Sequence, residues 1–326
     1  MMLEHGGKLD EAVARYGRAR EEWLDLSTGV NPLAYPAPVL PADIWHRLPE
    51  PSPALLDAAC AYYGAAQLLP VAGSQAAIGA LPRLRDVSRV VIGAPAYAEH
   101  AERWRRARHE VIELPYTELE GALDTCDVMV VCNPNNPTGA AIGAEQLRAW
   151  AAKLAARGGW LVVDEAFADA DPSKSVATDS PGLIVLRSVG KFFGLAGLRL
   201  GFVIAQSGLL DALRDEIGPW SVSAAAQIIG TAALKDVAWQ RETRQRLRRE
   251  GLRLQSLLAE YDIASSGCAL FQWWNAPRAE AFADHMARRA ILVRKFAGGG
   301  IRLGLPLHEH DWLRLSRSLN EWFSGK

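Results

Sequence analysis

The chain has 326 residues, about half of them apolar, and its 36 Lys and Arg nearly balance its 37 Asp and Glu. This length predicts two domains with a substantial buried core. The balanced charge argues against a general nucleic-acid or anionic-membrane surface, because either would need an excess of basic residues. A pocket inside such a protein can still be charged.

The N-terminus and the cysteines indicate the compartment. Charge begins at the fourth residue, and no apolar core of a signal peptide follows. Apolar runs also stay well short of the roughly 20 residues that a bilayer span needs. The four cysteines, at positions 60, 126, 132 and 268, form no C-x-x-C pair, which favours a reducing environment. We therefore expect a cytoplasmic protein with neither a membrane nor a nucleic-acid partner.

The N-terminal part of the chain is expected to form an arm. Residues 9–22 predict a short helix, and residues 31–53 contain seven of the 18 prolines. Prolines at this density prevent regular helix and favour extended backbone. We assign residues 1–44 to an arm that packs with the smaller domain.

After the arm, short apolar runs alternate with helical patterns. Strands are predicted at residues 89–92, 110–114, 127–132, 160–163, 183–187 and 201–205. Helices are predicted at residues 75–85, 97–108 and 144–157. Continuous apolar strands between helices indicate a buried, mostly parallel sheet. The fold class is therefore α/β, with a large domain expected at residues 45–222.

The last third of the chain has a different pattern. Residues 224–260 predict one long amphipathic helix, whose basic residues are interleaved with glutamates and therefore favour a solvated face over nucleic-acid binding. Strands near residues 268–274, 291–294 and 301–304 precede a terminal helix from about residue 309. We expect a smaller α+β domain at residues 223–326.

Lys191 is the first candidate for chemistry, since only seven of the 36 Lys and Arg are lysines. In the segment SVGKFFGLAGLR, from Ser188 to Arg199, it is flanked by phenylalanines and glycines. Desolvation lowers the pKa of a lysine and exposes its lone pair for imine formation. On this context alone, a surface lysine is the alternative.

Two further candidates follow apolar strands. Asp164 ends the run WLVV, where an unpaired carboxylate is costly. A protonated ring nitrogen would pair it and make a pyridine ring an electron sink, although a helix cap or an ion pair would also use an aspartate. The segment NPNNPTG, from Asn133 to Gly139, must turn sharply, and Pro137 biases Asn136 away from helical angles. That bias can hold the Asn136 amide toward a pocket, but a plain turn would use the same residues.

A phosphate site is expected at the start of a helix. The residues from Gly73 to Gln75 precede a helical pattern, where exposed backbone N–H groups bind phosphate and Ser74 adds a hydroxyl. Ser188 and Arg199 can complete this cradle, Arg199 by a two-pronged charge-assisted contact.

Other known motifs fit less well. A P-loop around Lys191 would need a glycine at position 185 and Ser or Thr at position 192, where this chain has Val185 and Phe192. His308, Glu309 and His310 are ligand-like residues, but the pattern after them is that of a helix start. We expect no metal site.

Taken together, these segments resemble the class I/II aminotransferase superfamily of fold type I, whose members use pyridoxal 5′-phosphate (PLP). The resemblance covers nearly the whole chain and rests on Gly73-Ser74-Gln75, Tyr97, NPNNPTG, Asp164-Glu165-Ala166 and the segment from Ser188 to Gly201. It implies a mostly parallel central sheet flanked by helices, a smaller α+β domain at the C-terminus, and a homodimer.

The resemblance also implies how the cofactor is held. Lys191 would bind it covalently, and Asp164 would pair with the pyridine nitrogen. Asn136 would donate to the phenolic oxygen, and Tyr97 would stack on the ring. The residues assigned to the cofactor phosphate and its loop are Gly73, Ser74, Gln75, Ser188 and Arg199.

On the substrate side, Arg302 in GGIRLG matches the family's arginine for the α-carboxylate. Arg294 is a second candidate, with a surface arginine as the alternative. His5-Gly6-Gly7, followed by DLSTGVNPL at residues 25–33, resembles the threonine-phosphate decarboxylase branch more than the aminotransferases. The paired glycines with His5 and Lys8 can form a nest for a substrate phosphate, with a frayed tail as the alternative.

This branch implies a small phosphorylated amino acid as substrate. The reaction would convert O-phospho-L-threonine to (R)-1-amino-2-propanol O-2-phosphate, a precursor in cobalamin biosynthesis. The alternative is amine transfer on a phosphorylated substrate such as histidinol phosphate. A cofactor-binding regulator without turnover is a third hypothesis, which the intact lysine and the substrate-side arginines disfavour.

Two positions depart from the family pattern. Phe167 follows Asp164-Glu165-Ala166 where the family often has a tyrosine, and Leu48 replaces the tyrosine of an Arg-Tyr-Pro motif. Each replacement removes a hydroxyl that the family uses on the cofactor, while Lys191, Asp164 and Arg199 remain.

Overall fold

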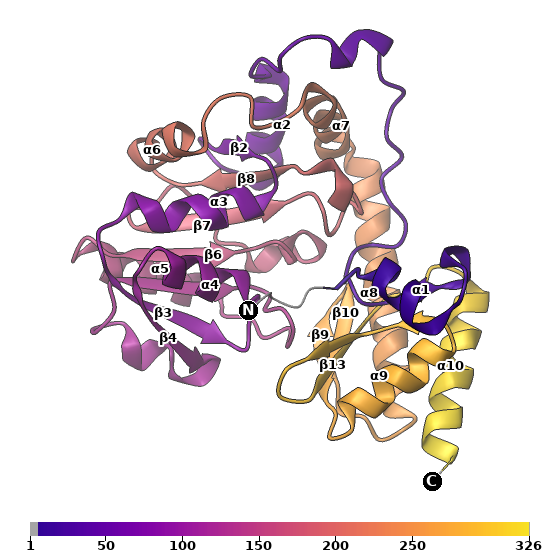
Figure 1. The fold of residues 1–326 in the computed structure, drawn as a ribbon. Helices are drawn as coiled ribbons and strands as arrows, with labels where there is room; N and C mark the ends of the chain where they lie inside the picture. The colour runs from indigo at the N-terminus through magenta and orange to yellow at the C-terminus, as the bar shows by residue number, and fades with distance from the viewer. Residues whose placement is uncertain (1–5, 326) are drawn as a thin grey trace. The chain divides into compact units, whose positions relative to one another are not determined.

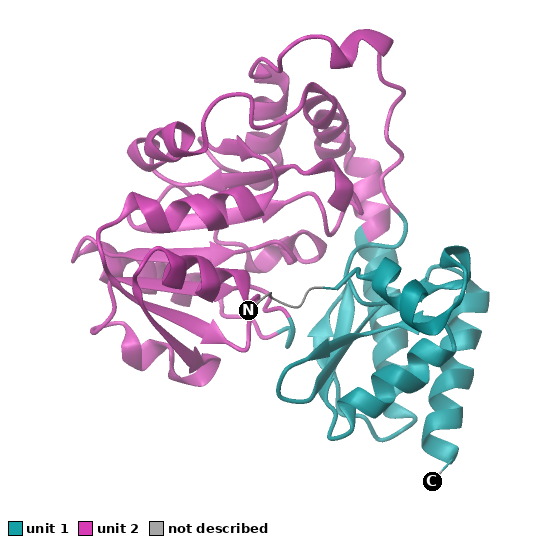
Figure 2. Cartoon of the chain, viewed as in Figure 1, with its two compact units in different colours: residues 1–33, 137–139, 244–326 teal, residues 34–136, 140–243 magenta. Residues whose placement is uncertain are grey.

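The computed structural model describes residues 6–325, which divide into two compact units (Figure 2). The larger unit comprises residues 34–136 and 140–243. The smaller unit comprises the chain up to residue 33, residues 137–139 and the chain from residue 244. The domain ranges expected from the sequence divide the chain at other residues, and we keep them as a prediction.

A seven-stranded sheet forms the centre of the larger unit (Figure 1). Its strand order is β2-β8-β7-β6-β5-β3-β4. The strands are β2 (Leu69–Val71), β3 (Arg89–Ala94), β4 (Glu110–Pro115), β5 (Val128–Cys132), β6 (Trp160–Asp164), β7 (Leu183–Ser188) and β8 (Gly201–Ile204). Strands β3 to β7 are parallel, and β8 is antiparallel to both β2 and β7. The predicted mostly parallel α/β fold is confirmed.

Helices provide the apolar cover that these strands need. The helices of this unit are α2 (Pro53–Tyr63), α3 (Ser74–Ala80), α4 (Glu99–Arg106), α5 (Ala144–Ala155), α6 (Ser207–Ile217) and α7 (Ala224–Lys235). In one core cluster, Ile78 of α3, Trp104 of α4 and Leu213 of α6 pack with strand residues such as Val130 and Ile184. All five residues of β5 are buried, as expected for an inner parallel strand.

This topology brings the candidate segments to one edge of the sheet. Strands β5, β6 and β7 are adjacent and parallel, so their carboxyl ends meet there. The NPNNPTG segment follows β5, Asp164 ends β6, and Ser188 ends β7. Ligands of α/β sheets bind at such an edge, outside the carboxyl ends of the strands.

The smaller unit combines helices with two small sheets. Strands β9 (Ser266–Cys268), β10 (Phe271–Asn275), β12 (Arg294–Phe296) and β13 (Gly300–Gly304) form an antiparallel sheet of order β12-β13-β10-β9. Strand β1 (Leu24–Asp25) pairs in parallel with β11 (Ile291–Leu292). The helices are α1 (Leu9–Tyr16), most of α8 (Val237–Ala259), α9 (Ala279–Arg288) and α10 (Glu309–Ser324). The expected α+β character is confirmed.

The N-terminal prediction needs one adjustment. The helix predicted over residues 9–22 ends at Tyr16, because Gly17 adopts a left-handed φ of 69°. A 3₁₀ turn then covers Arg20–Glu22. The expected lack of regular helix in the proline-rich stretch is confirmed: residues 31–41 contain no helix or strand, a 3₁₀ turn covers Ala42–Trp45, and α2 begins at Pro53.

The prediction of one helix over residues 224–260 is wrong. Helix α7 ends at Lys235 and α8 (Val237–Ala259) begins after Asp236, whose ψ of 80° is not helical. The Asp236 carboxylate accepts a hydrogen bond from Trp239 N at 3.0 Å. The Gln240 amide donates to the carbonyls of Ala233 and Leu234. These two side chains provide hydrogen-bond partners for the backbone groups left unpaired where α7 ends and α8 begins. The amphipathic pattern of residues 224–260 therefore spans two helices.

Within residues 6–325, every helix is either too short or too polar to cross a membrane.

We predict that Asp236→Ala lowers the free energy of unfolding by about 1 kcal/mol, because the first turn of α8 loses its side-chain acceptor. Urea unfolding of the purified variant measures the change. Asp236→Asn is the matched control and should stay close to the wild type, since asparagine is an equally good N-cap. Equal losses in both variants would contradict a capping role.

Candidate active site

A cavity of about 150 Å³ lies in the larger unit at the carboxyl ends of β5, β6 and β7. The structure brings together in its lining all nine residues that the sequence assigned to the cofactor. These are Gly73, Ser74, Gln75, Tyr97, Asn136, Asp164, Ser188, Lys191 and Arg199. Their individual roles stay predictions, and their convergence from five separate segments is an observation.

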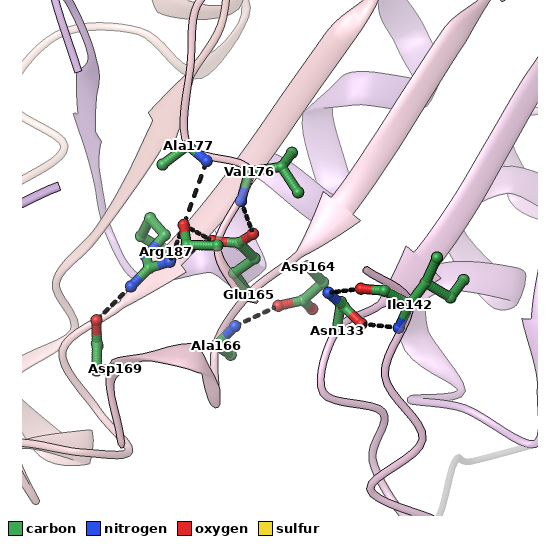
Figure 3. A network of polar contacts seen from close by, with 10 residues as sticks. Asn133, Ile142, Asp164, Glu165, Ala166, Asp169, Val176, Ala177 and Arg187 are labelled. Atoms are coloured by element: carbon green, nitrogen blue, oxygen red, sulfur yellow. Dashed lines mark hydrogen bonds and ion pairs between the residues drawn. The ribbon is translucent and has the colours of Figure 1, made fainter. Parts of the chain in front are cut away.

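Asp164 lies at the base of this arrangement and is only 5% exposed. Its Oδ1 accepts a hydrogen bond from Ala166 N at 3.0 Å, and its Oδ2 lies 2.9 Å from His100 Nε2. Its backbone carbonyl accepts from Asn133 N, which ties the end of β6 to the segment after β5. Figure 3 shows Asp164 between Ala166 and Asn133. The carboxylate is therefore held from several sides.

His100 is a site residue that the sequence reasoning missed. It is 2% exposed, and its Nε2 contacts Asp164. Burial alone would lower the pKa of His100, but the hydrogen bonds to Asp164 and Cys132 more than compensate and raise it to about 10. His100 is thus a cation at neutral pH and balances the buried carboxylate. No local pattern signals this contact, because His100 and Asp164 lie 64 positions apart in the sequence.

Tyr97 is held by a chain of side chains along α3 and α4. Its hydroxyl donates to Gln75 Oε1 at 3.1 Å, and Gln75 Nε2 donates to Glu99 Oε2 at 2.9 Å. Arg103 Nε donates to the same oxygen of Glu99. Burial raises the pKa of Tyr97 to about 12, so the phenol stays neutral at physiological pH. These contacts fix the ring against the cavity.

The expected phosphate cradle is built around two close approaches. A Cβ at Gly73, whose φ is 72°, would lie 2.7 Å from Arg199 Nη2, and a Cβ at Gly201 would lie 2.6 Å from Ser74 N. Arg199 is anchored by donating to Ala196 O at 3.1 Å. Only glycine lets a guanidinium and the backbone N–H groups at the start of α3 approach so closely. This concentration of donors suits a dianion.

Lys191 is half-buried beside an apolar wall. Its Nζ lies 5.4 Å from the centre of the Phe167 ring, and Phe167 is 5% exposed. Phe192 and Phe193, the next two residues, are fully buried. The apolar surroundings expected for this amine are therefore present.

The lining fits pyridoxal 5′-phosphate by the chemistry of its donors. In this cavity, the Lys191 amine suits the aldehyde of the cofactor and the buried Asp164 carboxylate suits its pyridinium nitrogen. The neutral phenol of Tyr97 suits the pyridine ring, and the cationic cradle around Arg199 suits the phosphate.

The substrate-side residues lie in the smaller unit. Gly6, Gly7 and Arg294 line one cavity of about 240 Å³, together with Lys8 and Lys295. Gly7 adopts a φ of 78° and donates its N–H to Ser27 Oγ at 2.8 Å. Acidic residues share the lining, and they include Glu11 and Glu280, which pair with the two lysines. His5, also assigned to this nest, lies outside the described residues.

Arg302 does not line that cavity. It is 4% exposed, and its Nη2 donates to Ser27 O at 2.7 Å. On adjacent antiparallel strands, Arg302 of β13 lies directly opposite Arg294 of β12. Burial and the charge of Arg294 lower the pKa of Arg302 to about 10. Two arginines thus face each other where like charges repel.

We predict that His100→Gln lowers the free energy of unfolding by about 2 kcal/mol near neutral pH, because a charge-assisted hydrogen bond is lost. The folded-state pKa of His100, about 10, lies above its unfolded value of 6.5, so the stabilisation is complete below about pH 6.5 and is lost as the pH rises through about 10. Urea unfolding of the wild type and the variant across this range measures the difference.

The matched control for that prediction is His46→Gln, which changes an exposed histidine. It should unfold like the wild type at every pH. A stability difference between the wild type and His100→Gln that does not shrink at high pH would contradict a charged His100.

Comparisons with known proteins identify the family. The family model described as aminotransferase class I and II matches residues 39–321. A threonine-phosphate decarboxylase from Pseudomonas aeruginosa is 50% identical over 98% of this chain and 97% of its own length. Another from Sinorhizobium sp. is 41% identical over 93% of each chain.

A solved structure shares the fold. It is a histidinol-phosphate aminotransferase from Sinorhizobium meliloti in complex with pyridoxal 5′-phosphate. Its TM-score is 0.81, at 21% identity, over 99% of this chain and 96% of that one. Because the family model covers most of the chain and close relatives span nearly all of it, this protein belongs to the aminotransferase class I and II family.

Proposed function

We propose that this protein is a PLP-dependent threonine-phosphate decarboxylase. It would convert O-phospho-L-threonine to (R)-1-amino-2-propanol O-2-phosphate in cobalamin biosynthesis. The observation that carries the proposal is the 50% identity to the decarboxylase of Pseudomonas aeruginosa over 98% of this chain. The nine cofactor-assigned residues in the lining of the larger unit's cavity support the cofactor.

Four side chains would hold the reactive end of the cofactor. Lys191 carries the amine for its aldehyde, and the Asp164 carboxylate would accept a hydrogen bond from the protonated pyridine nitrogen. His100, a cation at neutral pH, lies 2.9 Å from Asp164 Oδ2 and holds the carboxylate in place. Asn136 and Tyr97 line the same cavity and would contact the ring.

When bound, PLP supplies an electron sink for the charge that a breaking bond leaves on the substrate's Cα. Which bond breaks is set by the residues that hold the substrate's carboxylate, since the bond perpendicular to the ring is the one that is activated. Decarboxylation therefore requires a carboxylate held in that direction. The Lys191 amine, or a water near it, would then return a proton to Cα.

The smaller unit supplies cations for a doubly anionic substrate. Arg294 and Arg302 lie opposite each other on β12 and β13, and like charges in this position destabilise a sheet. An anionic group near this pair would relieve the repulsion. We assign the α-carboxylate to Arg302, and the phosphate to Arg294 with the Gly6-Gly7 turn and Lys8, which line one cavity with it.

Purified protein mixed with O-phospho-L-threonine should release CO₂ and form the phosphorylated amino alcohol, identified by mass spectrometry. Lys191→Ala should lower kcat/KM by roughly 10²–10⁴-fold or more, because its amine both binds the cofactor and moves a proton. Lys153→Ala, which removes an exposed lysine of α5, is the matched control and should retain full activity.

Amine transfer is the competing outcome of the same experiment. Rapid transfer from histidinol phosphate to 2-oxoglutarate, with no CO₂ from O-phospho-L-threonine, would replace the decarboxylase by an aminotransferase. Cofactor absorbance without turnover of either substrate would favour a binding protein.

We also propose a homodimer, formed over an apolar surface of the larger unit. Val39, Trp45 and Leu48, within the proline-rich residues 31–53, are 98%, 71% and 63% exposed, and Trp220 is 61% exposed. The 3₁₀ turn that contains Trp45 packs on α7. Large apolar side chains with this exposure are typical of interaction surfaces. A second copy of the chain is the occupant that family membership favours.

A cytoplasmic location completes the proposal. All four cysteines lie within the described part of the chain, and each is a free thiol. Reduced thiols fit a reducing compartment.

Light scattering during size-exclusion chromatography should give about twice the chain mass of 35.5 kDa. The double substitution Trp45→Asp with Leu48→Asp should shift the protein to the monomer, because two desolvated charges oppose association. Val87→Asp, at a side chain that is 75% exposed and outside the arm, should remain a dimer. A monomeric wild type would contradict the proposal.

A further inference from the structure

A buried ionic network lies next to the cofactor-side residues and has no part in the chemistry described so far. Arg187, Glu165 and Asp169 are each at most 2% exposed. One guanidinium nitrogen of Arg187 donates to Glu165 and the other to Asp169. Figure 3 shows Glu165 pointing away from Asp164 and toward Arg187. The Arg187 guanidinium thus forms ion pairs with two buried carboxylates.

The network extends into the loop after β6. Glu165 Oε1 accepts from Val176 N at 2.7 Å, and Glu165 Oε2 accepts from Ser175 Oγ at 2.6 Å. Arg187 Nη1 also donates to Ser175 Oγ at 3.2 Å. Both ends of segment 165–176, and its middle at Asp169, are therefore attached to a side chain of β7. The segment includes Phe167, which contacts Lys191.

Two of the three network members, Glu165 and Arg187, are chain neighbours of cavity residues. Glu165 follows Asp164, and its backbone N still donates to Leu186 O, which extends the β ladder by one residue. Arg187 precedes Ser188 within β7. Because successive strand residues point to opposite faces, Asp164 and Ser188 line the cavity while Glu165 and Arg187 meet on the other face.

The energetics favour a positional role over a purely stabilising one. Burial opposes the charge of Arg187, yet the carboxylates of Asp169 and Glu165 raise its pKa above the ordinary value. The Tyr63 ring, 4.5 Å from Arg187 Cζ, adds a cation–π contact. Buried ion pairs are often no more stabilising than apolar side chains of similar volume, whereas their directional bonds fix geometry.

We propose that Arg187 is a positioning residue for the cofactor site: through Glu165 and Asp169 it fixes Asp164, Phe167 and Ser188 at the cavity. The inference rests on the cofactor of the proposed function and is independent of the substrate. Loosening the network should move the carboxylate and the apolar wall relative to Lys191 while the sheet remains folded.

The test measures PLP affinity of the apoprotein by absorbance titration, beside the thermal midpoint of the same apoprotein. Arg187→Lys keeps the charge but cannot reach both carboxylates, and it should weaken PLP binding roughly tenfold or more, as supporting partners of ligand groups do. In the loaded enzyme, kcat should fall by roughly 100-fold with a smaller change in KM, because the reacting groups are misplaced.

A second pair of variants decides the question if Arg187→Lys does not fold. Asp169→Ala removes one acceptor and should weaken PLP binding, whereas Asp169→Asn keeps an oxygen for Arg187 and should largely restore it. His109→Gln is the control for a buried polar network: His109 is 6% exposed and bonds Ser88 N and Pro82 O at the amino end of β3. It should lower the thermal midpoint without changing PLP affinity.

Unchanged PLP affinity in Arg187→Lys and Asp169→Ala, with a lowered thermal midpoint as in the control, would overturn the positioning role and leave a structural one. If wild-type protein binds PLP but does not decarboxylate O-phospho-L-threonine, the proposed substrate fails while the affinity comparison still tests Arg187. A wild type that binds no PLP would overturn both.

Discussion

The need to pair one buried carboxylate organises the larger unit. Asp164 ends β6 at a position that is only 5% exposed, where an unpaired negative charge would be strongly unfavourable. The histidine at 2.9 Å, charged at neutral pH, occupies one of its oxygens. Its other oxygen accepts a hydrogen bond from Ala166 N, and the carboxylate lies at the cavity, where it can face a second cation. A pyridinium ring nitrogen is such a cation, and the remainder of the lining matches the other groups of the same cofactor.

The end of β6 serves two purposes because a strand has two faces. On one face Asp164 and Ser188 reach the cavity, and on the other Glu165 and Arg187 form an ion pair. Each of these two cavity residues is thus joined by a single peptide bond to a residue of the buried ion pair. Such coupling is effective because strand backbones are constrained by ladder hydrogen bonds along their whole length.

The candidate chemistry is divided between the two units. Every residue assigned to the cofactor belongs to the larger unit, and every described residue assigned to the substrate belongs to the smaller one. The facing arginines of β12 and β13 illustrate what the smaller unit supplies. Two cations on neighbouring strands are suited to a substrate that carries two anionic groups, such as a carboxylate and a phosphate.

The sequence by itself determined the α/β class, most strand positions, and nine residues that line one cavity. These features depend on local patterns: apolar runs form inner strands, and polar motifs directly after parallel strands converge at one edge. Only the tertiary structure decided that His100 pairs with Asp164, 64 positions away, and that Arg187 joins Glu165, 22 positions away. It also decided the helix break at Asp236, where capping side chains interrupt a continuous amphipathic pattern. Such contacts depend on which side chains packing brings together, and no periodicity in the chain encodes them.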